Sequence, residues 1–186
     1  FDADSLAAEQ IYDLSDLAEV VPGFAVSKSI GSGSAFIIRG IGSFGIGASV
    51  TGSIVAAVNG HSVNENVVSD LGFIDLERIE VLKGPQGTKF GRNSVGGVIN
   101  LVTARPTDEL GGYVDYEVGS LDRNLIKGAI NVPISNDVRM RLAFASNTRE
   151  GIVTKEAVKD YFVQDTTEAT FDDRNDLAIR LSLDWD

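Results

Sequence analysis

Few residues in this 186-residue chain have types and spacings that could carry chemistry. The stretch Gly40 to Gly45 reads GIGSFG and fits the GxGxxG pattern of dinucleotide sites. Such a site needs a helix that begins at the glycines and offers its N-terminus to the pyrophosphate. The residues that follow, 46–53, are Gly, Ala, Ser, Thr, Val and Ile, and most of these begin a helix poorly. We therefore predict no nucleotide cofactor.

Two further groups could bind a metal or act in catalysis. His61 is the only histidine, and the chain has no cysteine, so it lacks the ligand set of a zinc site. Asp172, Asp173 and Asp176 offer oxygen ligands without the glycine and terminal glutamate of an EF-hand loop. We interpret His61 as a solvated turn residue and the aspartates as a solvated acidic loop. The sequence thus predicts no catalytic residue, no metal, no cofactor and no enzyme.

Composition narrows the class of protein. A hydrophobic fraction of 43% and a charged fraction of 23% are typical of a folded chain. The net charge of −11 argues against a nucleic-acid partner, because neutralising phosphates requires clustered Lys and Arg. No apolar run approaches the ~18 residues of a transmembrane helix. The opening Phe-Asp-Ala-Asp has no Met and no basic segment, so we expect a processed or truncated start.

The first hundred or so residues predict a small mixed α/β domain with long loops. Asp4 or Ser5 is the candidate cap of a short helix that runs to Gln10, and Ser15 is the candidate cap of a second one that Pro22 stops. The pair Asn59–Gly60 favours a two-residue hairpin turn. Strands are predicted at 35–39, 79–82 and 97–103, a hairpin at 53–63, a helical turn at 71–78, and loops at 24–33, 40–52 and 64–70.

After Pro106 the pattern changes to strict alternation of apolar and polar residues. Four runs have this period of two, and they cover residues 114–118, 126–132, 138–144 and 177–185. Short turns at 120–124 and 135–137 contrast with a long polar segment at 147–175. Transmembrane barrels show this contrast between short turns and long outer loops. A soluble antiparallel sheet packed on one face gives the same alternation, and the pattern leaves both open.

One long motif resembles a known family. Leu76 to Pro106 reads LERIEVLKGPQGTKFGRNSVGGVINLVTARP and is similar to the plug signature of TonB-dependent outer-membrane receptors. Three upstream pieces match in order: DLAEVVPGF from Asp16, IIRGIG from Ile37 and VNG from Val58. The resemblance covers residues 5–106 and continues weakly into GAINVPIS and RLAF of the following strands. Within it, Gly91, Gly96 and Gly97 are expected to let backbone pack where side chains would collide.

The resemblance implies a fold and a function. Residues 1–106 would form an α+β plug, a small mixed sheet with short helices and long loops. Residues 107–186 would form about four antiparallel transmembrane strands of a β-barrel that this chain is too short to close. The protein would lie in the outer membrane of a Gram-negative bacterium, with its plug accessible from the periplasm. It would import a scarce nutrient, by family default an iron–siderophore complex, with carbohydrate or another bulky solute possible. The alternative is a soluble α/β ligand- or nucleotide-binding domain.

Partners and site residues also follow from the resemblance. Expected partners are TonB, through a segment upstream of this chain, outer-membrane lipid and an extracellular nutrient ligand. Arg39 and Lys83 occupy positions where the family carries arginines that face barrel carboxylates, and Lys83 is a departure because lysine lacks the bidentate fork. Three loops, 27–33, 44–46 and 64–66, would point outward as ligand-facing apices. Their candidate contact residues are Ser29, Gly31, Phe44, Ile46, Asn64 and Asn66.

Overall fold

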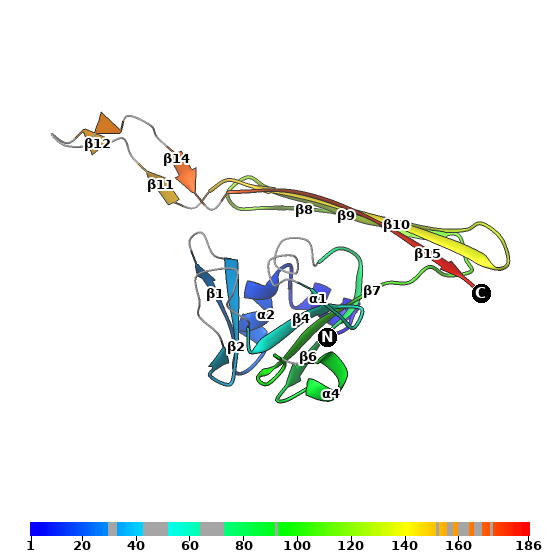
Figure 1. The fold of residues 1–186 in the computed structure, drawn as a ribbon. Helices are drawn as coiled ribbons and strands as arrows, with labels where there is room; N and C mark the ends of the chain where they lie inside the picture. Colours follow the sequence, from blue (N-terminus) through cyan, green and yellow to red (C-terminus); the bar gives the residue numbers. More distant parts are fainter. Residues whose placement is uncertain are drawn as a thin grey trace. The chain divides into compact units, whose positions relative to one another are not determined.

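A computed structural model describes the chain in two compact units, Phe1–Arg105 and Pro106–Asp186 (Figure 1). The residues described are 1–29, 33–42, 52–63, 73–91, 93–151, 153–155, 158–159, 164–165, 169–171 and 173–186. Each unit has its own hydrogen-bonded sheets, and each is described by itself.

The first unit opens with two short helices, α1 (Ala3–Ala8) and α2 (Leu14–Val20). Their caps differ from the predicted ones. Asp2 caps α1 by accepting from the Ser5 backbone N–H, and Asp13 caps α2 in a reciprocal capping box with Asp16. The predicted caps Asp4, Ser5 and Ser15 lie inside the first turns instead. An aspartate two or three residues earlier already satisfies free N–H groups there.

An antiparallel sheet of three strands follows: β1 (Phe24–Ser29), β2 (Gly33–Ile38) and β3 (Ile41–Gly42). The predicted loop at 24–33 is therefore wrong for residues 24–29 and for Gly33, and Ser29 is the last residue of a strand. Phe24 pairs with Ile38 across the hairpin, and its ring lies 6.2 Å from the ring of Phe36. This buried cross-strand packing stabilises β1, whose second half, Ser27 to Ser29, does not predict a strand by itself.

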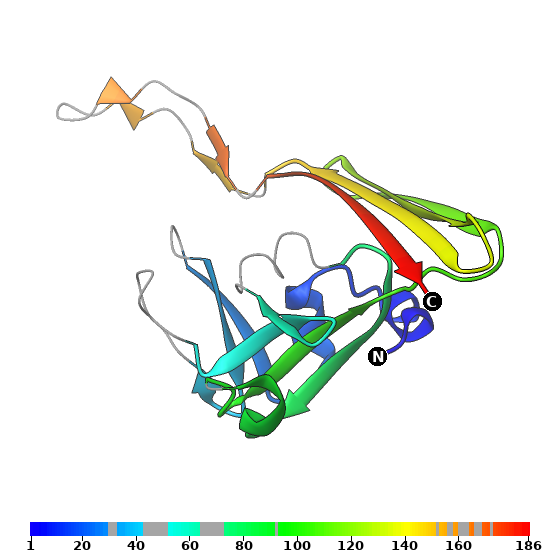
Figure 2. The ribbon, with the colours of Figure 1, turned by 45° about the vertical axis from the view of Figure 1, so that its right-hand side comes forward.

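The central sheet of the first unit has the order β5-β4-β7-β6. Its strands are β4 (Ile54–Val58), β5 (His61–Val63), β6 (Leu76–Lys83) and β7 (Gly97–Thr103), with a short helix α4 (Gly87–Phe90) between the last two. The β4–β7 pair is parallel and the other pairs are antiparallel, so the sheet is mixed as predicted. Figure 2 shows β4, β6 and β7 in one layer beside the helices.

Two local predictions in this sheet have opposite outcomes. The Asn59–Gly60 hairpin is confirmed, with φ of 51° and 82° at its two turn residues. The helical turn predicted for 71–78 is wrong at its end, since β6 already begins at Leu76, which pairs with Thr103. Pairing with β7 overrides the local preference here. Residues 71 and 72 lie outside the described part of the chain.

The core of the first unit lies between its helices and its sheets. Leu17, Ile38, Ile79, Ile99 and Leu101 are at most 1% exposed and belong to one hydrophobic cluster. These residues come from α2, β2, β6 and β7, so this cluster joins a helix to both sheets of the unit. A second, smaller cluster contains Val55, Ala57, Phe90 and Val98.

The second unit contains one antiparallel sheet of the order β15-β10-β9-β8. Its strands are β8 (Gly111–Gly119), β9 (Arg123–Pro133), β10 (Val138–Arg149) and β15 (Arg174–Trp185). The four predicted alternating runs are thus confirmed as strands. Between β10 and β15, β11 (Val153–Lys155) pairs with β14 (Ala169–Phe171), and β12 (Val158–Lys159) pairs with β13 (Gln164–Asp165). The segment predicted as polar loop therefore contains short hairpin pairs.

Among the described residues, no helix has the length and apolar character required to cross a membrane.

Candidate functional site

The sheet of the second unit has two chemically different faces. Its register places Leu181 opposite Leu142, and Leu142 opposite Ile130, so the apolar residues of all four strands share one face. On β15 this face is open, with Ile179 68% and Leu181 58% exposed. The exposed apolar residues of this face are Val114, Tyr116, Val118, Ile126, Ile130, Leu142, Leu177, Ile179, Leu181, Leu183 and Trp185. A continuous apolar face of this size indicates a surface that meets an apolar environment.

The opposite face of the same sheet is polar. Lys127 lies opposite Asp115 and its amino group is 3.9 Å from Glu117, while Arg180 is half-buried on β15. Small residues accompany the charged ones, and Ala178 stands directly opposite Ala145. Apolar residues on one side and charged residues on the other are the arrangement of strands that separate lipid from a polar lumen.

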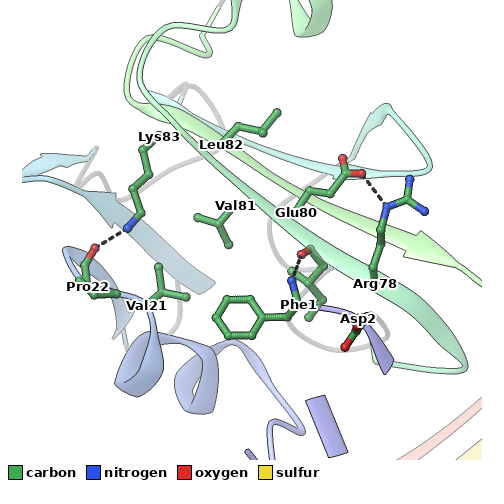
Figure 3. Close-up of a pocket in the computed structure, with 10 residues that line it drawn as sticks. Phe1, Asp2, Val21, Pro22, Arg78, Glu80, Val81, Leu82 and Lys83 are labelled. Carbon is green, nitrogen blue, oxygen red and sulfur yellow. Dashed lines mark hydrogen bonds and ion pairs between the residues drawn. The ribbon is translucent and has the colours of Figure 1, made fainter. Parts of the chain in front are cut away.

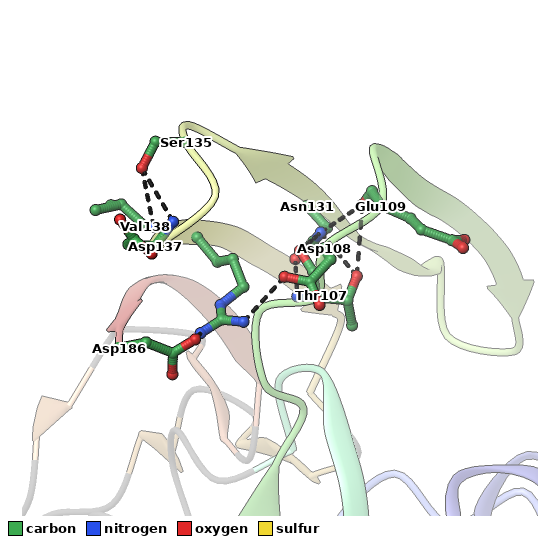
Figure 4. Close-up of polar contacts among 9 residues, drawn as sticks. Thr107, Asp108, Glu109, Asn131, Ser135, Asp137, Val138 and Asp186 are labelled. Carbon is green, nitrogen blue, oxygen red and sulfur yellow. Dashed lines mark hydrogen bonds and ion pairs between the residues drawn. The ribbon is translucent and has the colours of Figure 1, made fainter.

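Polar contacts hold one end of this sheet (Figure 4). The amide of Asn131, 2% exposed, donates to the carbonyls of Thr107 (2.7 Å) and Glu109 (2.5 Å) and accepts from the Thr107 N–H (2.8 Å). Asn131 therefore ties the segment that enters β8 to the neighbouring strand β9. The sequence contains no motif that points to this contact, because the two residues are 24 positions apart.

The same end carries an ion-pair cluster. Arg139, at the start of β10, contacts Asp108 at 2.9 Å and Asp186 at 2.6 Å. Beside it, the Ser135 hydroxyl accepts from the Val138 N–H at 3.1 Å and closes the short β9–β10 turn (Figure 4). Arg139 thus joins the segment before β8 to the residue after β15. This contact lies at the end of the sheet that carries the short β9–β10 turn.

In the first unit, a groove of about 460 Å³ lies along the free edge of β6 (Figure 3). Phe1 forms a two-way backbone pair with Ile79: its amino group donates to the Ile79 carbonyl at 3.0 Å, and the Ile79 N–H donates to the Phe1 carbonyl at 2.7 Å. Asp2 forms a β-bridge with Arg78. Val21 and Pro22, at the end of α2, close the other side of the groove.

A polar network crosses the sheet next to this groove. Asn100, 5% exposed, donates to Glu80 at 2.9 Å and accepts from the Gly60 N–H at 2.9 Å. Arg78 also donates to Glu80 at 2.8 Å. These contacts, the Asn100 hydrogen bond first and the Arg78 hydrogen bond second, hold the pKa of Glu80 below its ordinary value of 4.5. Glu80 is therefore a carboxylate that the folded unit prefers in its charged form.

The lowered pKa of Glu80 predicts how acid affects the first unit. A carboxylate with a folded pKa below its unfolded one stabilises the fold fully above about pH 4.5, and this contribution is lost as pH falls through the folded pKa. Glu80→Gln should therefore lower stability at neutral pH and make the loss of stability below pH 4.5 shallower. Acid titration of the protein by circular dichroism measures this. Glu19→Gln, on the exposed side of α2, controls for the loss of one carboxylate, and an identical acid limb in wild type and Glu80→Gln would contradict the assignment.

The two residues predicted to contact the barrel both lie at the Pro22–Gly23 turn. Lys83, the last residue of β6, donates from its amino group to the Pro22 carbonyl at 2.7 Å. Arg39, exposed in the β2–β3 turn with φ of 52°, donates its backbone N–H to the Gly23 carbonyl at 2.7 Å. The structure thus brings them to one turn, which sequence reasoning did not foresee. Of the predicted apex residues, Ser29 ends β1, and Gly31, Phe44, Ile46, Asn64 and Asn66 lie outside the described residues.

The glycines of the long motif have two separate roles. A Cβ on Gly96 would lie 2.9 Å from Ile41, and one on Gly97 would lie 2.4 Å from the Leu82 carbonyl oxygen, so close packing explains both. Gly91 has nothing within 4 Å of that position and instead adopts a φ of +79°. The expectation of close packing is wrong for Gly91, where glycine supplies backbone conformation.

The described residues bear on the other candidate sites as well. They contain no cluster of three or more His, Asp or Glu side chains that could hold a metal. Gly40 is followed by strand β3, and His61 is an exposed residue of β5. The residues 43–50 that would complete a nucleotide loop lie outside the described part.

Comparison with known proteins identifies similar chains. Residues 1–98 match the family model described as TonB-dependent Receptor Plug Domain. The vitamin B12 transporter BtuB of Vibrio vulnificus is 33% identical over 150 residues, which are 79% of this chain and 24% of the transporter. The pesticin receptor of Yersinia pestis is 39% identical over 62 residues, 33% of this chain and 9% of the receptor. The ferric enterobactin receptor PirA of Pseudomonas aeruginosa is 32% identical over 55% of this chain and 15% of that receptor.

Solved structures of similar fold were also found. The ferric yersiniabactin uptake receptor FyuA from Yersinia pestis matches with a TM-score of 0.76 and 25% identity, over 85% of this chain and 25% of that one. The siderophore receptor PirA from Pseudomonas aeruginosa matches all of this chain with a TM-score of 0.61 and 21% identity, which shows the fold. In every case this chain spans about a quarter of its relative or less and less than a third of the matched structures.

Proposed function

The chain belongs to the TonB-dependent receptor family of the outer membrane, whose members are not enzymes, and from this premise we propose that it gates the import of a scarce nutrient. Residues 1–106 would be the plug and residues 107–186 the first barrel strands. The observation that carries the proposal is the four-stranded sheet of the second unit, which exposes one apolar face along all its strands directly after a plug fold. A soluble nucleotide or ligand domain has no use for such a face.

In this proposal each unit has a separate task. The apolar face of β8, β9, β10 and β15 would contact lipid, and the charged face would line the lumen. The plug would close the lumen until TonB, acting through a segment upstream of Phe1, shifts or partly unfolds it. In the plug sheet, β6 is an edge strand, and the groove lies beside its residues Val81 to Lys83. An edge strand with few neighbours can separate locally while the rest of the unit stays folded, which supports a plug that opens in steps.

For the substrate we propose an iron–siderophore complex. The relatives whose names mention ferric enterobactin, yersiniabactin and ferripyoverdine support this class, and a vitamin B12 transporter is the relative that favours a different bulky solute. The test is uptake by a strain that expresses the full-length protein and lacks its own receptors of this kind. Uptake of radiolabelled ferric chelates that stops when TonB is deleted supports the proposal. Recovery of the protein as a soluble, detergent-independent monomer overturns it.

We also propose that Arg39 pairs with a carboxylate of the barrel wall. Its backbone is held by Gly23 and its side chain is exposed in the first unit, so the guanidinium is available to a partner outside that unit. Arg39→Ala in the full receptor should raise passive leak of large solutes, measured as sensitivity to an antibiotic too large for ordinary porins. Arg39→Lys, which keeps the charge, should leak less. Unchanged leak and unchanged uptake in Arg39→Ala would count against this pairing.

For the ligand we propose contact with the apex loops, above all with Phe44. An aromatic side chain in a stretch that the sequence predicts as a loop fits a site that combines apolar contact with a few polar groups. Phe44→Ala should weaken substrate binding by about 1–3 kcal/mol, the range for losing a buried apolar side chain. Binding per receptor and receptor abundance are both measured on the same membranes. A fall in abundance at constant affinity would make Phe44 a structural residue and refute the contact.

A further inference from the structure

The chain that leaves the first unit and enters the second is held on each side by an asparagine side chain. In the first unit, the Asn59 amide donates to the Thr103 hydroxyl at 3.0 Å, and its oxygen accepts from the Thr103 N–H at 2.9 Å. In the second unit, the Asn131 amide makes the corresponding pair with Thr107, donating to the hydroxyl at 2.8 Å and accepting from the N–H at 2.8 Å. Only residues 104–106 separate the two threonines.

The two asparagine contacts differ in their exposure to water. Asn131 is 2% exposed, and its amide also donates to the carbonyls of Thr107 at 2.7 Å and Glu109 at 2.5 Å (Figure 4). Asn59 is exposed in the turn between β4 and β5. Water replaces a hydrogen bond readily at an exposed amide, whereas a buried amide that loses its partners stays unsatisfied. The contact of Asn131 is therefore the harder of the two to open.

Arg139 adds a second attachment to the same segment. Its guanidinium contacts Asp108 at 2.9 Å and Asp186 at 2.6 Å, and its side chain is 13% exposed. Asn131 belongs to β9 and Arg139 to β10, so residues 107–109 are held by two strands and, through Asp186, are linked to the end of β15. Charge-assisted hydrogen bonds of this kind are stronger than neutral ones. We refer to Asn131, Arg139 and residues 107–109 as the wall clamp.

The wall clamp precedes the β8–β9 ladder in the chain. The first pair of that ladder places Gly111 opposite Asn131. A pull that arrives from the first unit would otherwise open the ladder one pair at a time, with few hydrogen bonds resisting at each step. At the clamp, several hydrogen bonds share the single planar amide of Asn131, so they resist together. The clamp therefore protects β8 from being peeled off β9.

We propose that the wall clamp anchors the end of the plug to the barrel, so that force on the plug opens the Asn59–Thr103 contact and leaves Thr107 in place. The inference rests on the proposed function, in which TonB rearranges the plug while the barrel stays intact. It adds an order of release, because the contacts before residue 104 open first and the pull stops at the clamp. The plug then refolds from an end that has stayed attached to the wall.

Force spectroscopy of the full-length receptor in a lipid bilayer tests this order. The handle is attached through Glu9→Cys, at the exposed C-cap of α1, in a receptor without other cysteines. Unfolding from there to the clamp releases roughly 320–350 Å of chain, and we expect a pause at this extension. Asn131→Ala should shorten the pause at constant force roughly tenfold or more, because it removes several hydrogen bonds at once. Asn59→Gly, which keeps the positive φ of the turn and removes the matching amide, should leave the pause unchanged.

Hydrogen exchange of the receptor without substitutions is a second test. In urea that opens the first unit and leaves the barrel folded, the Leu101 amide of β7 should exchange. The Thr107 amide should stay protected together with the amides of β9. Exchange of Thr107 together with Leu101 overturns the proposal, as does a pause of equal length in the wild-type and Asn131→Ala receptors.

The thermal stability of the barrel separates anchoring from general stabilisation. We expect Asn131→Ala to shorten the pause while the barrel unfolds at nearly the wild-type temperature. A loss of barrel stability as large as the loss of the pause would make Asn131 a general barrel contact and would also refute the clamp. None of these readouts involves transport. A receptor that imports nothing can still show the clamp, and a TonB-dependent importer that fails the tests refutes the clamp alone.

Discussion

Replacing Gly97 with alanine should destabilise the first unit by about 2–6 kcal/mol, the sum of an overpacked contact and a strained backbone. The added Cβ would lie 2.4 Å from the Leu82 carbonyl oxygen and 2.9 Å from the Ile38 side chain. The first is backbone of the paired strand and the second belongs to the core, so neither moves cheaply. Gly97 also has a φ of +149°, which side-chain-bearing residues rarely adopt. The β6–β7 pairing and the contact with β2 would both be disturbed.

The measurement is protease resistance of the first unit in the membrane-inserted receptor, together with receptor abundance. Gly87→Ala is the matched control from the same motif. Its added Cβ would meet nothing within 4 Å, and it begins helix α4. Alanine there should be neutral or stabilise by up to about 1 kcal/mol. Equal resistance of the Gly97→Ala and wild-type receptors would show that the sheet tolerates the contact and that this explanation of Gly97 is wrong.

Replacing Ile179 with arginine should cost about 2–4 kcal/mol of folding stability in a bilayer, the range for a cation on the lipid face near the membrane midplane. Ile179 stands near the middle of β15 with 68% of its surface exposed, on the face shared with Leu142 and Leu181. An arginine in the bilayer centre loses its hydration, because the lipid supplies no hydrogen-bond partners. Reversible unfolding of the full receptor in lipid vesicles measures the change.

Ala178→Arg is the control, since it changes the neighbouring residue at nearly the same depth on the polar face. Ala178 stands opposite Ala145, and Lys127 lies one strand further on the same face. The arginine can remain hydrated there, so we expect a much smaller loss of stability. If Ala178→Arg cost as much as Ile179→Arg, or if neither had an effect, the exposed apolar face would not be in contact with lipid.

Several structural features followed from local sequence alone. The Asn59–Gly60 turn formed as predicted, because positive φ at both positions is a property of those two residue types. The strands of the second unit followed from strict alternation, since a period of two places each residue on one face without reference to the rest of the chain. The long glycine-rich motif likewise predicted the family that the comparison found.

Other features depended on partners that are distant in sequence. Strand β1 exists because Phe24 packs on Phe36 across a hairpin, and β6 starts at Leu76 because β7 pairs with it. No local sequence pattern predicts such contacts, because they form only when the partner strand is in place. The cap of α2 could have been predicted from the sequence, because Asp13 and Asp16 have the spacing of a capping box.

The sequence by itself determined the residue chemistry: a chain without cysteine, with one histidine, and with four alternating strands after a plug motif. Only the tertiary structure decided which of these residues lie in contact with one another. Asn131 reaches Thr107, Arg139 joins Asp108 to Asp186, and Phe1 pairs with the edge of β6. The physical reason is that a hydrogen bond or ion pair depends on two groups lying a few ångströms apart with suitable orientation. For residues tens of positions apart, only the folded chain sets that distance.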